Sequence, residues 1–186
     1  MEKKLSANDE LTQQLVAIGV KTWSDLVQFI QTLPYGRTAN RTDLSLVISE
    51  RKGTCSSKHA LLKKVADLNN IAGIELVIGI YKMNEVNTPG IGSELSDNGL
   101  SYIPEAHCYL KINNQQKDYT SINSTFQKIQ KDLLEELAIK PEQIAQFKVD
   151  YHQQYLKAWI AEEQIPMSFE DAWQIREICI QQLSNL

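Results

Sequence analysis

The stretch Gly53-Thr54-Cys55-Ser56-Ser57-Lys58-His59-Ala60-Leu61-Leu62 decides how this 186-residue chain is interpreted. Apolar residues recur after it at helical spacing as far as Asn69-Asn70, which predicts an α-helix that opens at Cys55. In the first turn of a helix, free backbone N–H groups and the macrodipole stabilise negative charge. A thiol attacks carbonyl groups as its thiolate, so the stretch predicts a cysteine nucleophile with Gly53 allowing close approach of the chain.

The region that follows the helix predicts three strands. Ile74–Met83 is rich in β-branched residues and indicates a buried strand. Ala106–Ile112 alternates, with Cys108 on the face that we expect to point into the core. Asn113-Asn114 can turn the chain, because asparagine tolerates left-handed backbone geometry, and we expect Lys117–Ile122 to return as the partner strand.

Helices are expected on both sides of these strands. One helix is capped within Ser6–Asp9, and a second begins at Trp23 and ends before Pro34. Asn84–Pro104 is expected to be a loop that forms part of a substrate cleft. The last third of the chain indicates about three helical pieces, so the fold class is α+β with an antiparallel sheet.

Three side chains then suggest a catalytic unit. Cys55 would attack, His107 would take the thiol proton and later return it, and Asp118 would hold the imidazole ring in one tautomer. A two-residue turn at Asn113-Asn114 places His107 opposite Thr120 and Asp118 on the same face as His107. The backbone N–H of Cys55 is the expected first donor to the oxyanion.

These residues resemble the transglutaminase-like superfamily. The Cys55 motif, Gly73-Ile74 at the entry to a strand, His107-Cys108-Tyr109-Leu110 and Asp118-Tyr119-Thr120 occur in the order that the family shows. The resemblance implies a papain-like core over residues 34–123, in which the cysteine helix packs on a small antiparallel sheet. Residues 124–186 would form a helical C-terminal extension of one domain that spans residues 1–186.

The resemblance also implies a chemistry. It implies acyl transfer through a thioester at Cys55, with His107 and Asp118 completing the triad and no cofactor. A protein or peptide is the expected substrate and water the expected acceptor, so the chain would hydrolyse an amide or peptide bond. Family members also include protein cross-linkers, peptide N-glycanases and non-catalytic relatives, so the substrate stays open.

Two other functions remain open. One is a non-catalytic module that binds peptides or proteins on the same fold. The other is an acyltransferase similar to the arylamine N-acetyltransferases, whose Arg-Gly-Gly-x-Cys motif is half matched by Arg51-Lys52-Gly53-Thr54-Cys55. Faster alkylation of Cys55 than of the other cysteines would argue against the binding module, and loading by acetyl-coenzyme A would identify the acyltransferase.

Composition limits the partners and the compartment. The net charge is −4 and the 19 basic residues are scattered, so neither nucleic acid nor membrane is an expected partner. The N-terminus lacks the pattern of a secretory signal, which predicts a cytoplasmic protein with reduced thiols. We expect Cys108 and Cys179 to be inert and His152 to be exposed on a helix. A zinc site that combines Cys55, His59, His107 and Cys108 is disfavoured, because strand alternation separates the last two.

Overall fold

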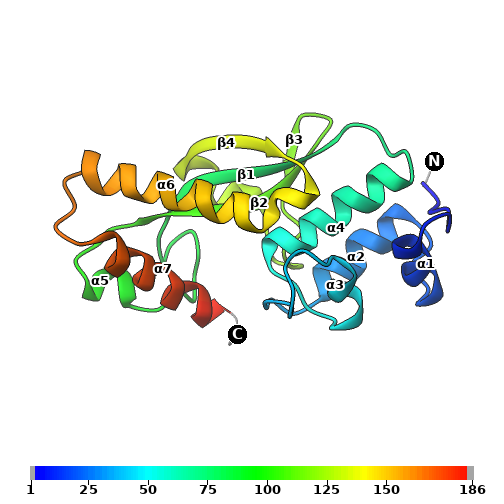
Figure 1. Ribbon diagram of the computed structural model, residues 1–186, viewed down its shortest axis with the longest axis horizontal. Coiled ribbons are helices and arrows are strands. Elements are labelled where there is room, and N and C mark those ends of the chain that lie inside the picture. Colours follow the sequence, from blue (N-terminus) through cyan, green and yellow to red (C-terminus); the bar gives the residue numbers. More distant parts are fainter. Residues whose placement is uncertain (1–2, 184–186) are drawn as a thin grey trace. The chain divides into compact units, whose positions relative to one another are not determined.

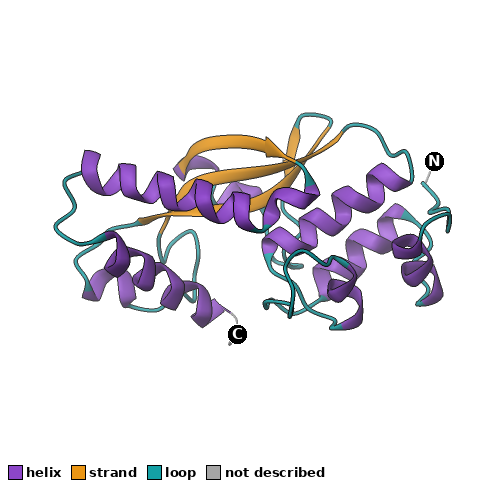
Figure 2. Ribbon diagram, in the orientation of Figure 1, coloured by secondary structure: helices purple, strands orange, loops and turns teal. Residues whose placement is uncertain are grey.

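The computed structural model describes residues 3–183. Within them the chain is an α+β protein with seven α-helices and a small four-stranded antiparallel sheet (Figures 1 and 2). The elements follow in the order α1 (Glu10–Ala17), α2 (Trp23–Thr32), α3 (Ser45–Ser49), α4 (Cys55–Leu68), β1 (Ile74–Met83), α5 (Glu94–Asp97), β2 (Ile103–Ile112), β3 (Gln115–Lys117), the 3₁₀ turns η1 (Phe126–Lys128) and η2 (Gln130–Asp132), β4 (Leu133–Ile139), the 3₁₀ turn η3 (Pro141–Ile144), α6 (Gln146–Glu162) and α7 (Phe169–Leu183).

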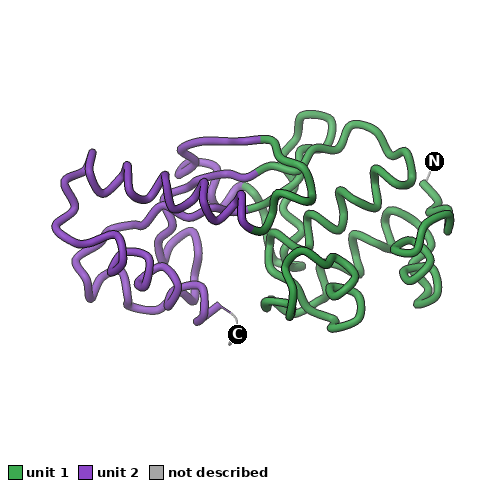
Figure 3. Tube along the Cα trace, viewed as in Figure 1, with its two compact units in different colours: residues 1–77, 108–126, 138–145 green, residues 78–107, 127–137, 146–186 purple. Residues whose placement is uncertain are grey.

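The chain forms two compact units (Figure 3). The first unit contains residues 1–77, 108–126 and 138–145, and the second contains residues 78–107, 127–137 and 146–186. Strands β1, β2 and β4 each contribute residues to both units, whereas α4 belongs to the first unit and α6 and α7 to the second. Each unit is described separately below.

Helix α4 is the centre of the first unit. It packs against α1, α2, α3 and η3, and all eight residues from Cys55 to Leu62 are buried. The predicted start at Cys55 is confirmed, because Thr54 caps the helix: its Oγ1 accepts a hydrogen bond from the Ser57 backbone N–H, and Ser57 Oγ accepts one from the Thr54 N–H. The helix is therefore enclosed on all sides over its first two turns.

The sheet has the strand order β3-β2-β1-β4. Strand β1 has the predicted bounds, Ile74–Met83, and nearly every residue in it is buried, as expected for an inner strand. The hairpin between β2 and β3 pairs Ile112 with Gln115, and both turn residues have positive φ, 50° at Asn113 and 64° at Asn114. The predicted two-residue turn is confirmed.

Strand β3 is shorter than predicted and begins earlier. It contains only Gln115–Lys117, so the expectation of a strand over Lys117–Ile122 is wrong. The Asp118 carboxylate accepts hydrogen bonds from the backbone N–H and the hydroxyl of Thr120, at 2.9 Å and 2.6 Å. This side-chain turn bends the backbone away from a ladder, because aspartate offers the N–H a local partner in place of the neighbouring strand.

The last third of the chain is not wholly helical. Leu133–Ile139 forms β4, which pairs with β1 at one edge of the sheet. Leucine, glutamate and alanine dominate this segment, and these residues favour helices when no other strand is near. Its mostly exposed or half-buried side chains suit a charged edge strand. The helical description of residues 124–186 is therefore corrected here, although α6 and α7 do lie in this region.

The other predicted helices agree with the structure. Asp9 caps α1 and Thr22 caps α2, which ends just before Leu33 and Pro34. The predicted loop over Asn84–Pro104 contains the short helix α5, and β2 begins at Ile103 rather than at Ala106.

The hairpin turn gives a stability prediction. Asn114→Val should lower the free energy of unfolding by about 1–2 kcal/mol, because a β-branched residue is strained at positive φ. Asn114→Gly is the matched control and should unfold at the same urea concentration as the natural chain or a higher one. Urea unfolding measures both, and equal midpoints for the two variants would contradict the turn geometry.

Candidate functional site

Cys55 is the first residue of α4, in the first unit. Its side chain is only 6% exposed, and its Sγ contacts Ser56 Oγ at 3.8 Å. The backbone of Gly53 pairs with the segment before it: the Gly53 N–H donates to the Pro34 carbonyl and the Gly36 N–H donates to the Gly53 carbonyl. The thiol thus lies at the positive end of a capped helix of 14 residues, which favours its thiolate form.

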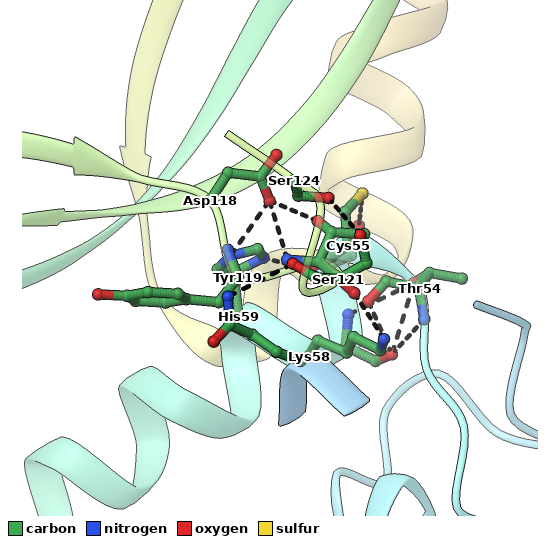
Figure 4. A network of polar contacts seen from close by, with 12 residues as sticks. Thr54, Cys55, Lys58, His59, Asp118, Tyr119, Ser121 and Ser124 are labelled. Atoms are coloured by element: carbon green, nitrogen blue, oxygen red, sulfur yellow. Dashed lines mark hydrogen bonds and ion pairs between the residues drawn. The ribbon is translucent and has the colours of Figure 1, made fainter. Parts of the chain in front are cut away.

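His59 lies one turn further along α4 and is completely buried. Its Nδ1 is 2.8 Å from the Cys55 carbonyl, and its Nε2 is 2.8 Å from the Tyr119 backbone nitrogen. A carbonyl only accepts and a backbone N–H only donates, so Nδ1 carries the proton and Nε2 is the acceptor. His59 is therefore a neutral imidazole, and both of its nitrogens are used in holding the backbone (Figure 4).

Asp118 lies next to His59, just after β3. Its Oδ1 is 3.7 Å from His59 Nε2. That nitrogen carries no proton that it could donate to the carboxylate, because it accepts a hydrogen bond from the Tyr119 N–H. The contact is thus an approach of two acceptors rather than an ion pair. The hydrogen bonds that orient the carboxylate come from Thr120.

Lys58 is a fully buried cation in the same cluster. Its Nζ donates to two backbone carbonyls, those of Leu33 and Thr120, both at 2.6 Å. Burial lowers the pKa of Lys58 from 10.5 to about 8, against the opposing effects of the Cys55 thiolate and the Asp118 carboxylate, which raise it. At neutral pH the Lys58 amine is therefore charged, and it interacts electrostatically with Cys55 and Asp118.

His107 is placed in the second unit, as the last residue of its segment 78–107. The ring is half-buried and meets Tyr81 edge-on, with 6.2 Å between the ring centroids. Of the three predicted triad residues, the structure thus brings Cys55 and Asp118 into one unit, in the cluster drawn in Figure 4, and places His107 in the other unit.

The second unit has a buried charged cluster of its own. Arg176 donates two hydrogen bonds of 2.6 Å to the Glu105 carboxylate. Burial alone would raise the pKa of Glu105, but Arg176 outweighs it and lowers the pKa to about 2. His152 faces the Pro104 carbonyl at 2.8 Å, and burial lowers its pKa to about 4. The expectation that His152 is exposed is wrong, because α6 turns this residue into the unit with 2% exposure.

The two other cysteines are fully buried. Cys108 lies on β2 and Cys179 on α7, each with 0% exposure. Burial raises the pKa of Cys179 to about 11, which keeps that thiol protonated at neutral pH.

The loop between β1 and β2 forms a depression of about 440 Å³ in the second unit. It is lined by Asn84, Glu85, Val86, Ile91, Gly92, Leu95, Ser96, Leu100, Ser101 and Asp132. The loop itself is held in shape by Asn87, whose side-chain amide donates to Lys82 and Asp132. The first unit has another depression, of about 500 Å³, between α1, the 42–45 segment and η3.

Residues 3–183 contain neither a cluster of metal-ligating side chains nor a membrane-spanning helix. In that range no three His, Cys, Asp or Glu side chains converge as a metal site would require. None of the described helices combines the length and the apolar character needed to cross a bilayer.

Lys58 and the partners of His59 are the features that the sequence did not predict. Ser56, Ser57, Lys58 and His59 form four consecutive polar residues in the first two turns of the helix. Because all four are buried, each needs a hydrogen-bonding partner within the fold. Such a polar run inside a buried helix is the signal that could have identified them.

Comparison of this chain with protein-family models, with curated proteins and with solved structures gave no match.

Gly53 gives a test of the packing around Lys58. A Cβ at Gly53 would lie 2.9 Å from Lys58 Cγ and 3.0 Å from Ser57 Oγ, so Gly53→Ala should destabilise the protein by about 1–3 kcal/mol. Gly36→Ala is the matched control, since its Cβ would meet only Lys52, at 3.5 Å, and should change stability by less than about 0.5 kcal/mol. Urea unfolding compares them, and equal losses would contradict the close packing.

The pKa of Lys58 predicts a pH dependence. Between pH 8 and 10.5 the folded state has lost the proton that the unfolded state still holds, so the free energy of unfolding should rise with pH across that window. Lys58→Met has no such proton, so the free energy of unfolding of the natural chain minus that of this variant should increase from pH 8 to 10.5. Urea unfolding over this range measures it, and a constant or decreasing value of natural minus variant would argue against a depressed lysine pKa.

Proposed function

We propose that this chain is a cysteine-dependent acyl-transfer enzyme of transglutaminase-like type, which hydrolyses an amide or peptide bond through a thioester. The observation that carries the proposal is the position of Cys55 at the capped N-terminus of α4, within one polar network that also holds Asp118. A helix N-terminus and a buried ammonium both favour the thiolate. The resemblance of the Cys55, His107 and Asp118 motifs to that superfamily supports the same chemistry.

The proposed reaction has two stages. His107 takes the Cys55 proton while Sγ attacks the substrate carbonyl carbon, and the oxyanion forms beside the Cys55 backbone N–H. The C–N bond then breaks, His107 gives its proton to the leaving amine, and a thioester remains. In the second stage His107 takes a proton from water, the hydroxide attacks the thioester, the C–S bond breaks and the thiol recovers its proton.

His107 is the base in this proposal because the other two histidines are already used. The nitrogens of His59 hold the Cys55 carbonyl and the Tyr119 N–H. His152 is kept neutral within the buried cluster of the second unit, where it donates to the Pro104 carbonyl. We therefore keep His107 as the proposed base that takes the Cys55 proton, with Asp118 orienting its ring, as the resemblance implies.

The proposal includes a substrate class and a location. A protein or peptide binds, in part, in the depression lined by the 84–104 loop, which offers both apolar and carboxylate side chains. We propose a cytoplasmic protein that binds neither nucleic acid nor membrane, since the net charge is −4 and the basic residues are scattered.

Alkylation tests the proposal without a known substrate. Near pH 6, iodoacetamide should modify Cys55 at least about tenfold faster than Cys108 or Cys179, because its thiolate is stabilised. The pH midpoint of the Cys55 rate should lie below the ordinary thiol value of about 8.5. Peptide mass mapping assigns the sites, and Cys55→Ser is the control for the assignment.

Two further results decide between enzyme and binding module. Asp118→Asn keeps an oxygen that can accept from Thr120 but removes the charge, so it should alter the pH profile of Cys55 alkylation. It should also lower the free energy of unfolding, because the buried Lys58 ammonium loses the carboxylate that it interacts with. Equal, slow alkylation of all three cysteines would overturn the enzymatic proposal. It would favour the non-catalytic peptide-binding module, which agrees with the 6% exposure of Cys55.

A further inference from the structure

Two consecutive residues of α4 form hydrogen bonds with two consecutive residues of the segment that follows β3. Lys58 Nζ donates to the Thr120 carbonyl at 2.6 Å, and His59 Nε2 accepts from the Tyr119 N–H at 2.8 Å. Asp118 closes the segment on itself by accepting from the Thr120 N–H. All these groups belong to the first unit, and Figure 4 shows them around the start of α4.

Burial makes these bonds decisive for the position of the segment. Lys58 and His59 are both fully buried, and a buried polar group without a partner costs about 1–3 kcal/mol or more. Their partners are backbone atoms, whose positions cannot change unless the whole 118–120 segment moves. The tautomer of His59 is fixed in the same way, by the Cys55 carbonyl on one side and the Tyr119 N–H on the other.

Lys58 adds a charge to this geometry. Its ammonium interacts electrostatically with both the Cys55 thiolate and the Asp118 carboxylate. The attraction is mutual: a thiolate that stabilises the Lys58 ammonium is itself stabilised by that ammonium. Two carbonyls, of Leu33 and Thr120, fix the amine in place.

We propose that Lys58 and His59 are positioning residues: His59 fixes the Asp118 segment on the helix that carries Cys55, and Lys58 fixes it while supplying the positive charge that the thiolate and the carboxylate share. The role in catalysis rests on the proposed function. The placement of the segment does not, so the two are tested by different measurements.

The first measurement is hydrogen exchange at the Tyr119 amide. His59→Phe keeps an aromatic ring of similar size but cannot accept, so this amide should exchange about tenfold faster, as expected for one lost hydrogen bond. His59→Gln places an acceptor near the position of Nε2 and should restore most of the protection. The amides within β1 serve as the internal control and should be unchanged in both variants.

The second measurement is the pH profile of Cys55 alkylation. Lys58→Met should raise the midpoint by about one pH unit, which lowers the rate near pH 6 about tenfold. Lys58→Arg retains a positive charge and should bring the midpoint back toward the natural value.

The outcomes separate the two proposals. Unchanged Tyr119 exchange in a folded His59→Phe would overturn the positioning role, whatever Cys55 does. A Cys55 midpoint that is ordinary in the natural chain, together with faster Tyr119 exchange in that variant, would overturn the proposed function and leave the placement of the segment supported. If His59→Phe does not fold, ¹⁵N spectra of the natural chain decide: Nε2 must be unprotonated at neutral pH, and a proton on it overturns the assignment.

Discussion

The burial of polar side chains in α4 is the constraint on which the first unit depends. Lys58 and His59 have no exposed surface, and inside a protein such groups must find partners or cost stability. One partner of each lies about 60 residues away in sequence, at Thr120 and Tyr119. Satisfying both side chains therefore requires the segment that follows β3 to lie against α4.

The same constraint shapes the proposed site. Cys55 is one turn before His59 on α4, and Asp118 is the first residue of the segment that the helix holds. The hydrogen bond from Lys58 to the Thr120 carbonyl thus has two effects. It satisfies the buried lysine, and it fixes an ammonium that interacts electrostatically with Cys55 and Asp118. Networks of this kind give a group a fixed orientation and a perturbed pKa, which are the properties that acid–base and nucleophilic chemistry requires.

The two units bury their cations in different ways. In the first unit Lys58 donates to two backbone carbonyls and interacts electrostatically with Cys55 and Asp118, which are themselves part of the proposed chemistry. In the second unit Arg176 makes two short hydrogen bonds to Glu105 and also donates to Glu177, and His152 stays neutral beside them. The fully paired cluster suits a structural role, whereas the cation shared between a thiol and a carboxylate suits a reactive one.

The sequence alone determined the features that depend on neighbouring residues: the helix that begins at Cys55, the strand Ile74–Met83 and the turn at Asn113-Asn114, because capping, β-branching and left-handed geometry are local properties. Tertiary structure alone decided that Leu133–Ile139 is a strand, since its helix-forming residues pair with β1 across a distance in sequence. It also decided the roles of Lys58 and His59. Which acceptor a buried donor finds depends on where another segment of the chain comes to lie, and no local pattern encodes that.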